Sequence, residues 1–89
     1  MGRAGPGYEW EHVVEQSQIN RSGFAPEQVN NSSNMPRVPA WVNRAKNAFY
    51  SSKPLFADGM TMREWLTGQS FEFQQAYGLA FLNDVIADR

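Results

Sequence analysis

The strongest pattern in the chain is helical and begins at residue 40, where apolar residues recur at spacings of three and four. These apolar positions are Trp41, Val42, Ala45, Ala48 and Phe49. The spacing predicts a helix over residues 40–51. Mostly off its apolar stripe lie Arg44, Lys46 and Asn47. The helix ends before Pro54, because the residue that precedes a proline avoids helical backbone.

A turn at Ala57–Gly59 leads into a shorter helix. Thr61 and Glu64 form a T-x-x-E capping box, in which each side chain bonds the backbone N–H of the other residue. The box predicts a short helix that runs through Leu66 and is closed by Gly68.

The last and longest helix is predicted from Phe71 to about Asp88. Ser70 is a good N-cap for it, and Glu72 is favourably placed in its first turn. Its apolar residues form a broad stripe, which is typical of packing. We expect the last two helices to supply the hydrophobic core through Trp65, Leu66, Phe71, Phe73, Tyr77, Phe81 and Leu82.

The first half of the chain carries weaker signals. Residues 8–14 (YEWEHVV) mix aromatic and β-branched side chains with polar ones and predict a short strand. Residues 15–34 predict a long ordered loop, with a helical turn in APEQVN that starts at Pro26. Residues 35–38 predict a second strand, which Pro36 confines to a sheet edge. The fold class is therefore expected to be α+β and mostly helical.

Length and composition restrict this fold to one small domain. The chain has 89 residues and no cysteine, which excludes a disulfide framework and a cysteine-ligated zinc site. We expect residues 1–7 (MGRAGPG) to be a flexible linker or an artificial start, and residues 8–89 to form a single domain cut from a larger protein. The apolar runs are too short to cross a bilayer, so no membrane partner is expected.

The formal net charge of −1 argues against a strongly basic nucleic-acid binder, although the charge is uneven. Between Glu27 and Asp58 there is no acidic residue, whereas the basic residues there are Arg37, Arg44, Lys46 and Lys53. Four positive charges could meet phosphate, but charge alone favours an ordinary solvated face.

Candidate chemistry centres on the single histidine, His12, which follows Glu11 in the first predicted strand. A phosphodiesterase of the ββα-metal kind needs an imidazole that deprotonates water and oxygen ligands that hold a divalent cation. Asn34 follows the long loop, and Asn43 and Asn47 share one face of the predicted helix. Asparagine is poor in a helix interior, so neither has a local reason to be there. The alternative is a structural histidine that is partly exposed or hydrogen-bonded.

Three stretches of the chain resemble one known family: EWEHVVEQ, INRSGFAPEQVNNSSN and FYSSKPLFADGMTMREWLTGQSFEFQQAYG. They resemble the C-terminal toxin domains of RHS/YD-repeat polymorphic toxins, in the HNH/endonuclease VII-like superfamily, with motifs such as W-[HE]-H-I-V-E-Q. The resemblance extends from Trp10 to about Leu82. It implies a small ββα-metal, HNH-like site packed on two C-terminal helices.

By position, the resemblance implies that Glu11 is a metal ligand and His12 the general base. It implies that Asn34 positions the base and its loop. The family's helix histidine falls at Asn43 and its loop histidine at Asn30, so both positions depart from the pattern. An amide oxygen at Asn43 suits magnesium, or manganese, better than zinc. The loss at Asn30 leaves open a weakened or inactive enzyme.

The remaining candidates surround this set. Asn47, one turn after Asn43, is a further candidate metal ligand. Arg37 or Arg44 is expected to hold an adjacent phosphate. Glu15 is either a partner that fixes the site or a solvated surface acid.

The resemblance implies the toxic nuclease tip of a larger secreted protein. Such a domain is delivered into the cytoplasm of a rival bacterium and neutralised at home by a cognate immunity protein. By family analogy, DNA is expected as substrate before RNA. Two alternatives stay open: a non-catalytic, mostly helical protein-interaction module, and the same fold with its chemistry lost.

Overall fold

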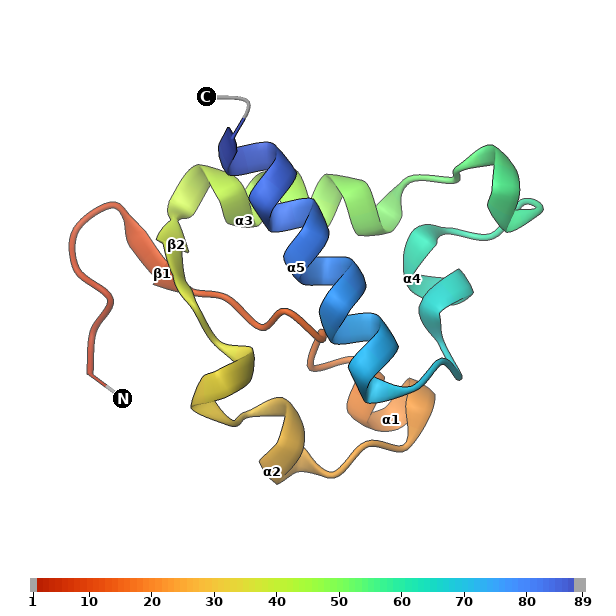
Figure 1. The fold of residues 1–89 in the computed structure, drawn as a ribbon, viewed down its shortest axis with the longest axis horizontal. Coiled ribbons are helices and arrows are strands. Elements are labelled where there is room, and N and C mark those ends of the chain that lie inside the picture. The colour runs from red at the N-terminus through yellow and green to blue at the C-terminus, as the bar shows by residue number, and fades with distance from the viewer. Residues whose placement is uncertain (1, 88–89) are drawn as a thin grey trace.

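Helices dominate the computed structural model, which describes residues 2–87 (Figure 1). Within these residues the elements are β1 (Tyr8–Trp10), α1 (Gln18–Ser22), α2 (Pro26–Val29), the 3-10 turn η1 (Ser32–Asn34), β2 (Arg37–Pro39), α3 (Ala40–Ser51), the 3-10 turn η2 (Leu55–Ala57), α4 (Met62–Leu66) and α5 (Phe71–Ala87). α5 crosses α3, while the two strands lie at one end of α3 and α4 at the other. The predicted α+β, mostly helical class is confirmed.

The sheet pairs β1 and β2 antiparallel, with Glu9 opposite Val38 at its centre. β1 stops at Trp10, earlier than predicted. Beyond it the Glu11 N–H still donates to the Pro36 carbonyl. Pro36 has no N–H to donate in return, so the regular ladder ends there and β2 begins only after it. The chain therefore leaves the sheet at the point where the candidate site residues begin.

α3 spans Ala40–Ser51, the range that its periodicity predicts. Its fully buried residues are Val42, Lys46 and Tyr50. They are four residues apart and therefore share one face. The prediction that Lys46 lies off the packed face is wrong, because its ammonium finds a carboxylate partner in the interior. The aromatic residues of the predicted stripe, Trp41 and Phe49, are only half-buried.

The starts of α4 and α5 follow the predicted caps. The Glu64 N–H donates to the Thr61 hydroxyl and the Thr61 N–H donates to the Glu64 carboxylate, so the capping box is complete. The backbone hydrogen bond from Thr61 is the main cause that lowers the pKa of Glu64. Ser70 Oγ accepts a backbone N–H in the first turn of α5. α5 is described as far as Ala87, and its predicted end at Asp88 lies outside the described residues.

The hydrophobic core differs from the prediction. One buried cluster comprises Val13, Val38, Val42 and Leu82, and a second comprises Tyr50, Met62 and Leu66. Of the predicted core residues only Leu66 and Leu82 are buried. Half-buried are Trp65, Phe71, Tyr77 and Phe81, and Phe73 is 41% exposed. The reason is that α5 buries only one narrow face, formed by Gln74, Gly78 and Leu82, so its aromatic side chains lie around that face.

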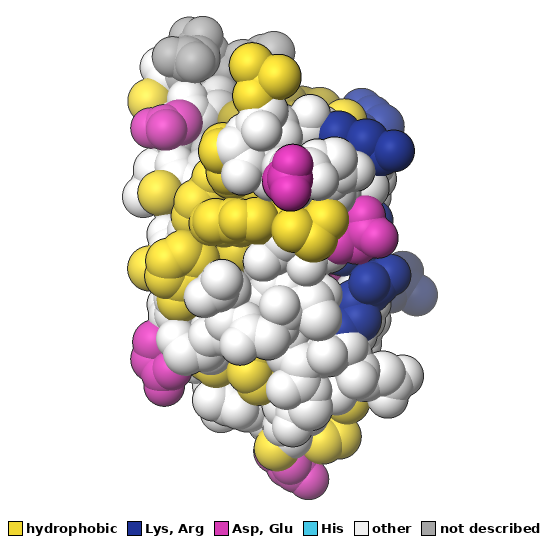
Figure 2. All heavy atoms as spheres, turned by 90° about the vertical axis from the view of Figure 1, so that its right-hand side faces the viewer, with side chains coloured by type: hydrophobic (Ala, Val, Ile, Leu, Met, Phe, Trp, Pro, Cys, Tyr) yellow, Lys and Arg dark blue, Asp and Glu magenta, His cyan; other side chains and the backbone are white. Residues whose placement is uncertain are grey.

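Several of these aromatic side chains form a connected patch, which we call the aromatic surface. It comprises Phe56, Trp65, Phe73 and Tyr77, whose neighbouring ring centroids lie between 5.1 and 6.0 Å apart. Phe56 is 58% exposed. Figure 2 shows hydrophobic side chains gathered on the side of the molecule that carries η2 and α4. The aromatic packing is therefore partly open to solvent.

The predicted loop over residues 15–34 contains a helix that the sequence analysis missed. α2 begins at Pro26 as predicted, but α1 precedes it. Gly23, in left-handed backbone with φ 77°, ends α1. The buried Gln18 side chain donates to the Arg63 carbonyl. Tertiary contacts of this kind stabilise a helix that is too short to be stable alone.

α5 has 17 residues and is the longest helix described. None of the helices in residues 2–87 combines the length and the apolar character needed to cross a membrane.

Gly78 allows α5 to approach the segment after β1 closely. A Cβ at this position would lie 2.8 Å from Val13 Cγ1 and 2.9 Å from the Tyr50 hydroxyl oxygen. Gly78→Ala should therefore lower the free energy of unfolding by about 1–3 kcal/mol, although alanine favours a helix. Urea unfolding measures this change. Asn83→Ala, at an exposed position of the same helix, is the control and should be neutral or slightly stabilising. A stabilised Gly78→Ala variant would contradict the close packing.

Candidate functional site

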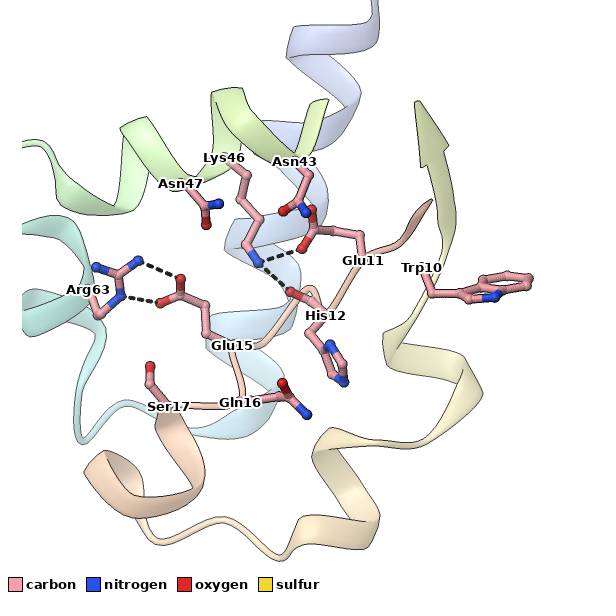
Figure 3. A pocket seen from close by; sticks show the side chains of 10 residues that line it. All are labelled: Trp10, Glu11, His12, Glu15, Gln16, Ser17, Asn43, Lys46, Asn47 and Arg63. Atoms are coloured by element: carbon pink, nitrogen blue, oxygen red, sulfur yellow. Dashed lines mark hydrogen bonds and ion pairs between the residues drawn. The ribbon is translucent and has the colours of Figure 1, made fainter. Parts of the chain in front are cut away.

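An open cleft of about 430 Å³ lies where the chain leaves β1 and faces α3 and α4 (Figure 3). Its lining residues come from segments that are far apart in the sequence: Trp10, Glu11, His12, Glu15, Gln16, Ser17, Asn43, Lys46, Asn47 and Arg63. Four predicted site residues are among them: Glu11, His12, Asn43 and Asn47. The structure therefore brings most of the predicted site to one place.

A buried ion pair forms the inner wall of the cleft. Lys46 Nζ lies 2.7 Å from Glu11 Oε1, and it also donates to the His12 carbonyl at 2.7 Å. Glu11 is only 3% exposed and Lys46 only 5%. Glu11 Oε2 is buried and has no hydrogen-bond partner in the described part of the chain. The lysine thus compensates the carboxylate charge through one oxygen only.

The His12 imidazole is held by a loop asparagine. Its Nε2 lies 3.0 Å from Asn30 Oδ1, which also accepts a hydrogen bond from the Gln16 side chain. An amide oxygen only accepts hydrogen bonds, so Nε2 carries the proton and Nδ1 of the neutral ring carries a lone pair. In Figure 3 the imidazole points toward Gln16, away from the Glu11 carboxylate. Neighbouring residues of an extended segment point to opposite sides, which explains this divergence.

Asn34 lies behind the cleft rather than in its lining. The side chain is fully buried, accepts from the Val14 N–H at 3.0 Å, and donates to the carbonyls of Val14 and Val29. These bonds join the loop after β1 to the segments before β2. The Asn34 side chain therefore fixes the backbone of the loop that follows His12.

Glu15 has a partner on α4. Its two carboxylate oxygens each lie 2.7 Å from the Arg63 guanidinium, in a two-pronged ion pair. The hydrogen bond from Arg63 to Glu15 raises the pKa of the Arg63 guanidinium. Of the two alternatives for Glu15, this geometry favours a partner that fixes the site over a solvated acid.

The two asparagines of α3 enter the cleft from above the ion pair (Figure 3). Asn43 Nδ2 donates to the carboxylate of Glu9, which fixes the amide and leaves Oδ1 as an acceptor. Asn47 lies one turn later and is exposed. Both therefore have an amide group at the cleft, but the Asn43 side chain is already tied to β1.

Neither predicted phosphate contact lines the cleft. Arg37 donates from Nε to the Ala4 carbonyl, and its guanidinium lies 3.7 Å from the centre of the Tyr8 ring. Arg44 is an exposed residue of α3. The basic residues that do line the cleft are Lys46 and Arg63.

These two basic residues were missed at the sequence level. The charge pattern groups Lys46 with the solvated charges, although Lys46 follows Asn43 by three positions and so shares its side of the helix. Arg63 lies 48 residues from Glu15, so only the tertiary fold brings the two together. The spacing of Asn43, Lys46 and Asn47 is a signal that could have revealed the lysine.

The cleft does not fit a divalent ion at Glu11. Within residues 2–87 no three histidine or carboxylate side chains converge as a metal-binding group. Glu11 Oε1 already faces the Lys46 ammonium, so an ion on Oε2 would lie close to a second positive charge. Two unit charges 4 Å apart interact by roughly 4 kcal/mol at an effective dielectric constant of about 20, and a divalent ion doubles this repulsion. The amide oxygens of the cleft could also coordinate the ion, but they carry no net charge and are too few to offset this repulsion.

Asn34→Ala should destabilise the fold at the segments that lie behind the cleft. The substitution leaves the backbone N–H and carbonyl of Val14 without their buried partner, and each such group costs about 1–3 kcal/mol. We expect the free energy of unfolding to fall by at least about 2 kcal/mol in urea titrations. The control is Asn31→Ala, because Asn31 is exposed and its side chain accepts only from the Ser33 N–H. Equal losses of stability in the two variants would contradict the view that the Asn34 side chain joins the loop after β1 to the segments before β2.

Tyr50 should make stability fall in alkali. Burial is the main cause that raises the pKa of its phenol, and the Glu15 and Glu11 carboxylates add to it. A group with a raised folded pKa favours the fold below its unfolded value, here about 10, and loses that contribution above it. Tyr50→Phe should therefore reduce the loss of stability above about pH 10, measured by thermal melting. Tyr8→Phe, at an exposed tyrosine, should leave that loss unchanged. If the melting temperatures of Tyr50→Phe and of the wild type fell in parallel above about pH 10, this role of Tyr50 would be refuted.

Comparisons of the chain with models of protein families, with curated proteins and with solved structures find no match.

Proposed function

We propose that this domain cleaves phosphodiester bonds of nucleic acid, as the toxin tip of a larger secreted protein, with His12 as the general base. The observation that supports this proposal is the hydrogen bond between His12 Nε2 and Asn30 Oδ1 at the rim of the cleft. That contact leaves the Nδ1 lone pair of the neutral ring for a proton. The resemblance to RHS/YD-repeat toxin domains supplies the substrate class.

In this proposal His12 acts on a water molecule. Nδ1 takes one proton from the water, and the water oxygen bonds to phosphorus on the side opposite the departing oxygen. The bond from phosphorus to that oxygen breaks, and the departing oxygen takes a proton from solvent. The Lys46 hydrogen bond to the His12 carbonyl holds the residue in place while the imidazole reacts. General-base catalysis of this kind contributes about 10²–10⁴ in rate.

The substrate and partners follow from the resemblance. DNA is proposed before RNA, and a cognate immunity protein is proposed as the partner in the producing cell. The proposed site of action is the cytoplasm of a rival bacterium. A nuclease needs an inhibitor in the cell that makes it, so the immunity protein is the partner that co-expression should reveal.

A second candidate function is a non-catalytic interaction module. Two observations favour it. Both basic residues of the cleft, Lys46 and Arg63, are paired with carboxylates, which weakens their attraction for phosphate. The aromatic surface leaves Phe56 and Phe73 substantially exposed, as protein-binding surfaces often do.

His12→Ala separates the two functions. We expect the wild type to nick supercoiled plasmid or to cut single-stranded RNA, and the variant to lose this activity by about 10²-fold or more. Each reaction is run with Mg²⁺, with Mn²⁺ and with EDTA, and followed by gel electrophoresis. The matched control is Gln28→Ala, an exposed residue of α2 outside the cleft, which should keep wild-type activity.

Two results would count against the nuclease. Folded wild-type protein that cuts neither substrate in any buffer would favour the interaction module. Cleavage that persists undiminished in His12→Ala would show that the proposed base is wrong.

A further inference from the structure

Lys46 is a lysine on the buried face of a helix, where an ammonium group requires a compensating anion. Its Nζ contacts two oxygens, Glu11 Oε1 and the carbonyl of His12, each at 2.7 Å. Both oxygens come from the segment that follows β1, while the lysine comes from α3. A single ammonium group therefore contacts two consecutive residues of the cleft.

The oxygens around Lys46 have the chemistry of a hard-cation site. Magnesium and calcium in proteins are held by carboxylate and carbonyl oxygens, which are the two kinds of oxygen that Nζ contacts. An ammonium supplies positive charge to the same oxygens, but it is tethered to α3 by the lysine side chain. Charge balance at Glu11 is thereby built into the chain.

We infer that Lys46 is the built-in cation of this cleft, and that its ammonium takes the place of the divalent ion that the toxin resemblance implies. The Glu11 carboxylate therefore binds no Mg²⁺ or Mn²⁺ in the wild-type protein. The inference deepens and rests on the proposed function: cleavage that depends on His12 should continue in EDTA.

The free oxygen of Glu11 does not restore a metal site. Oε2 is buried, and an ion on it would meet the Lys46 charge across the same carboxylate. Asn43 Nδ2 is bonded to the Glu9 carboxylate. The imidazole points to the other end of the cleft in Figure 3. Among the cleft residues, the groups left to complete a coordination shell at Glu11 are therefore neutral amide oxygens, which do not offset the Lys46 charge.

Mn²⁺ binding tests the inference without nucleic acid. Free Mn²⁺ is followed by electron paramagnetic resonance during titration of the wild type and of Glu11→Gln. We expect the two titrations to coincide, with no saturable site up to about 1 mM. Lys46→Met removes the ammonium and keeps the stem, so this variant should gain Mn²⁺ binding and a higher melting temperature with Mn²⁺.

Two matched variants complete the design. Lys46→Met combined with Glu11→Gln lacks the carboxylate and should lose the gained binding. Lys53→Met removes an exposed lysine instead and should gain none. If circular dichroism shows that Lys46→Met is unfolded, the comparison of the wild type with Glu11→Gln decides alone.

Two outcomes would overturn the inference. The first is saturable Mn²⁺ binding by the wild type that Glu11→Gln abolishes. The second is a folded Lys46→Met variant that gains no binding. Neither depends on cleavage, so failure of the nuclease proposal and failure of this inference are distinguishable.

Discussion

The buried ion pair between Glu11 and Lys46 constrains the rest of the cleft. Removing either charge from water is costly, and the cost is recovered only when the two groups meet. Their contact joins the segment after β1 to the packed face of α3, and the second hydrogen bond of Lys46 fixes the His12 carbonyl. Because neighbours in an extended segment point apart, holding Glu11 inward directs the imidazole outward, toward Asn30.

This constraint changes what the toxin resemblance means for the chemistry. A ββα-metal site requires the base and the metal ligand to converge on one ion. Here the strand–strand–helix order is present, but the carboxylate faces a lysine and the imidazole faces an amide. The phosphodiesterase that we propose therefore relies on its base alone, and the pairs Glu11–Lys46 and Glu15–Arg63 act as structural links.

The sequence predicted the elements whose signals are local. The helix at residues 40–51, the Thr61–Glu64 box and the Ser70 cap all depend on neighbours within a few positions, and all are confirmed. The ion-pair partners of Lys46 and Glu15 lie 35 and 48 residues away in the sequence, and no local pattern encodes such pairs. Four predicted site residues, Glu11, His12, Asn43 and Asn47, do line the cleft. The sequence pattern did not predict that Lys46 and Arg63 balance its carboxylate charges, because both ion pairs join distant segments.

The most direct test of this account is a double-mutant cycle on the ion pair. The free energy of unfolding is measured by urea titration for the wild type, Glu11→Gln, Lys46→Met and the double variant. Each single substitution should cost about 3–5 kcal/mol, because it leaves one buried charge or donor uncompensated. The double variant should cost clearly less than the sum of the two. Additive losses would contradict the account, since they would mean that the two groups do not depend on each other.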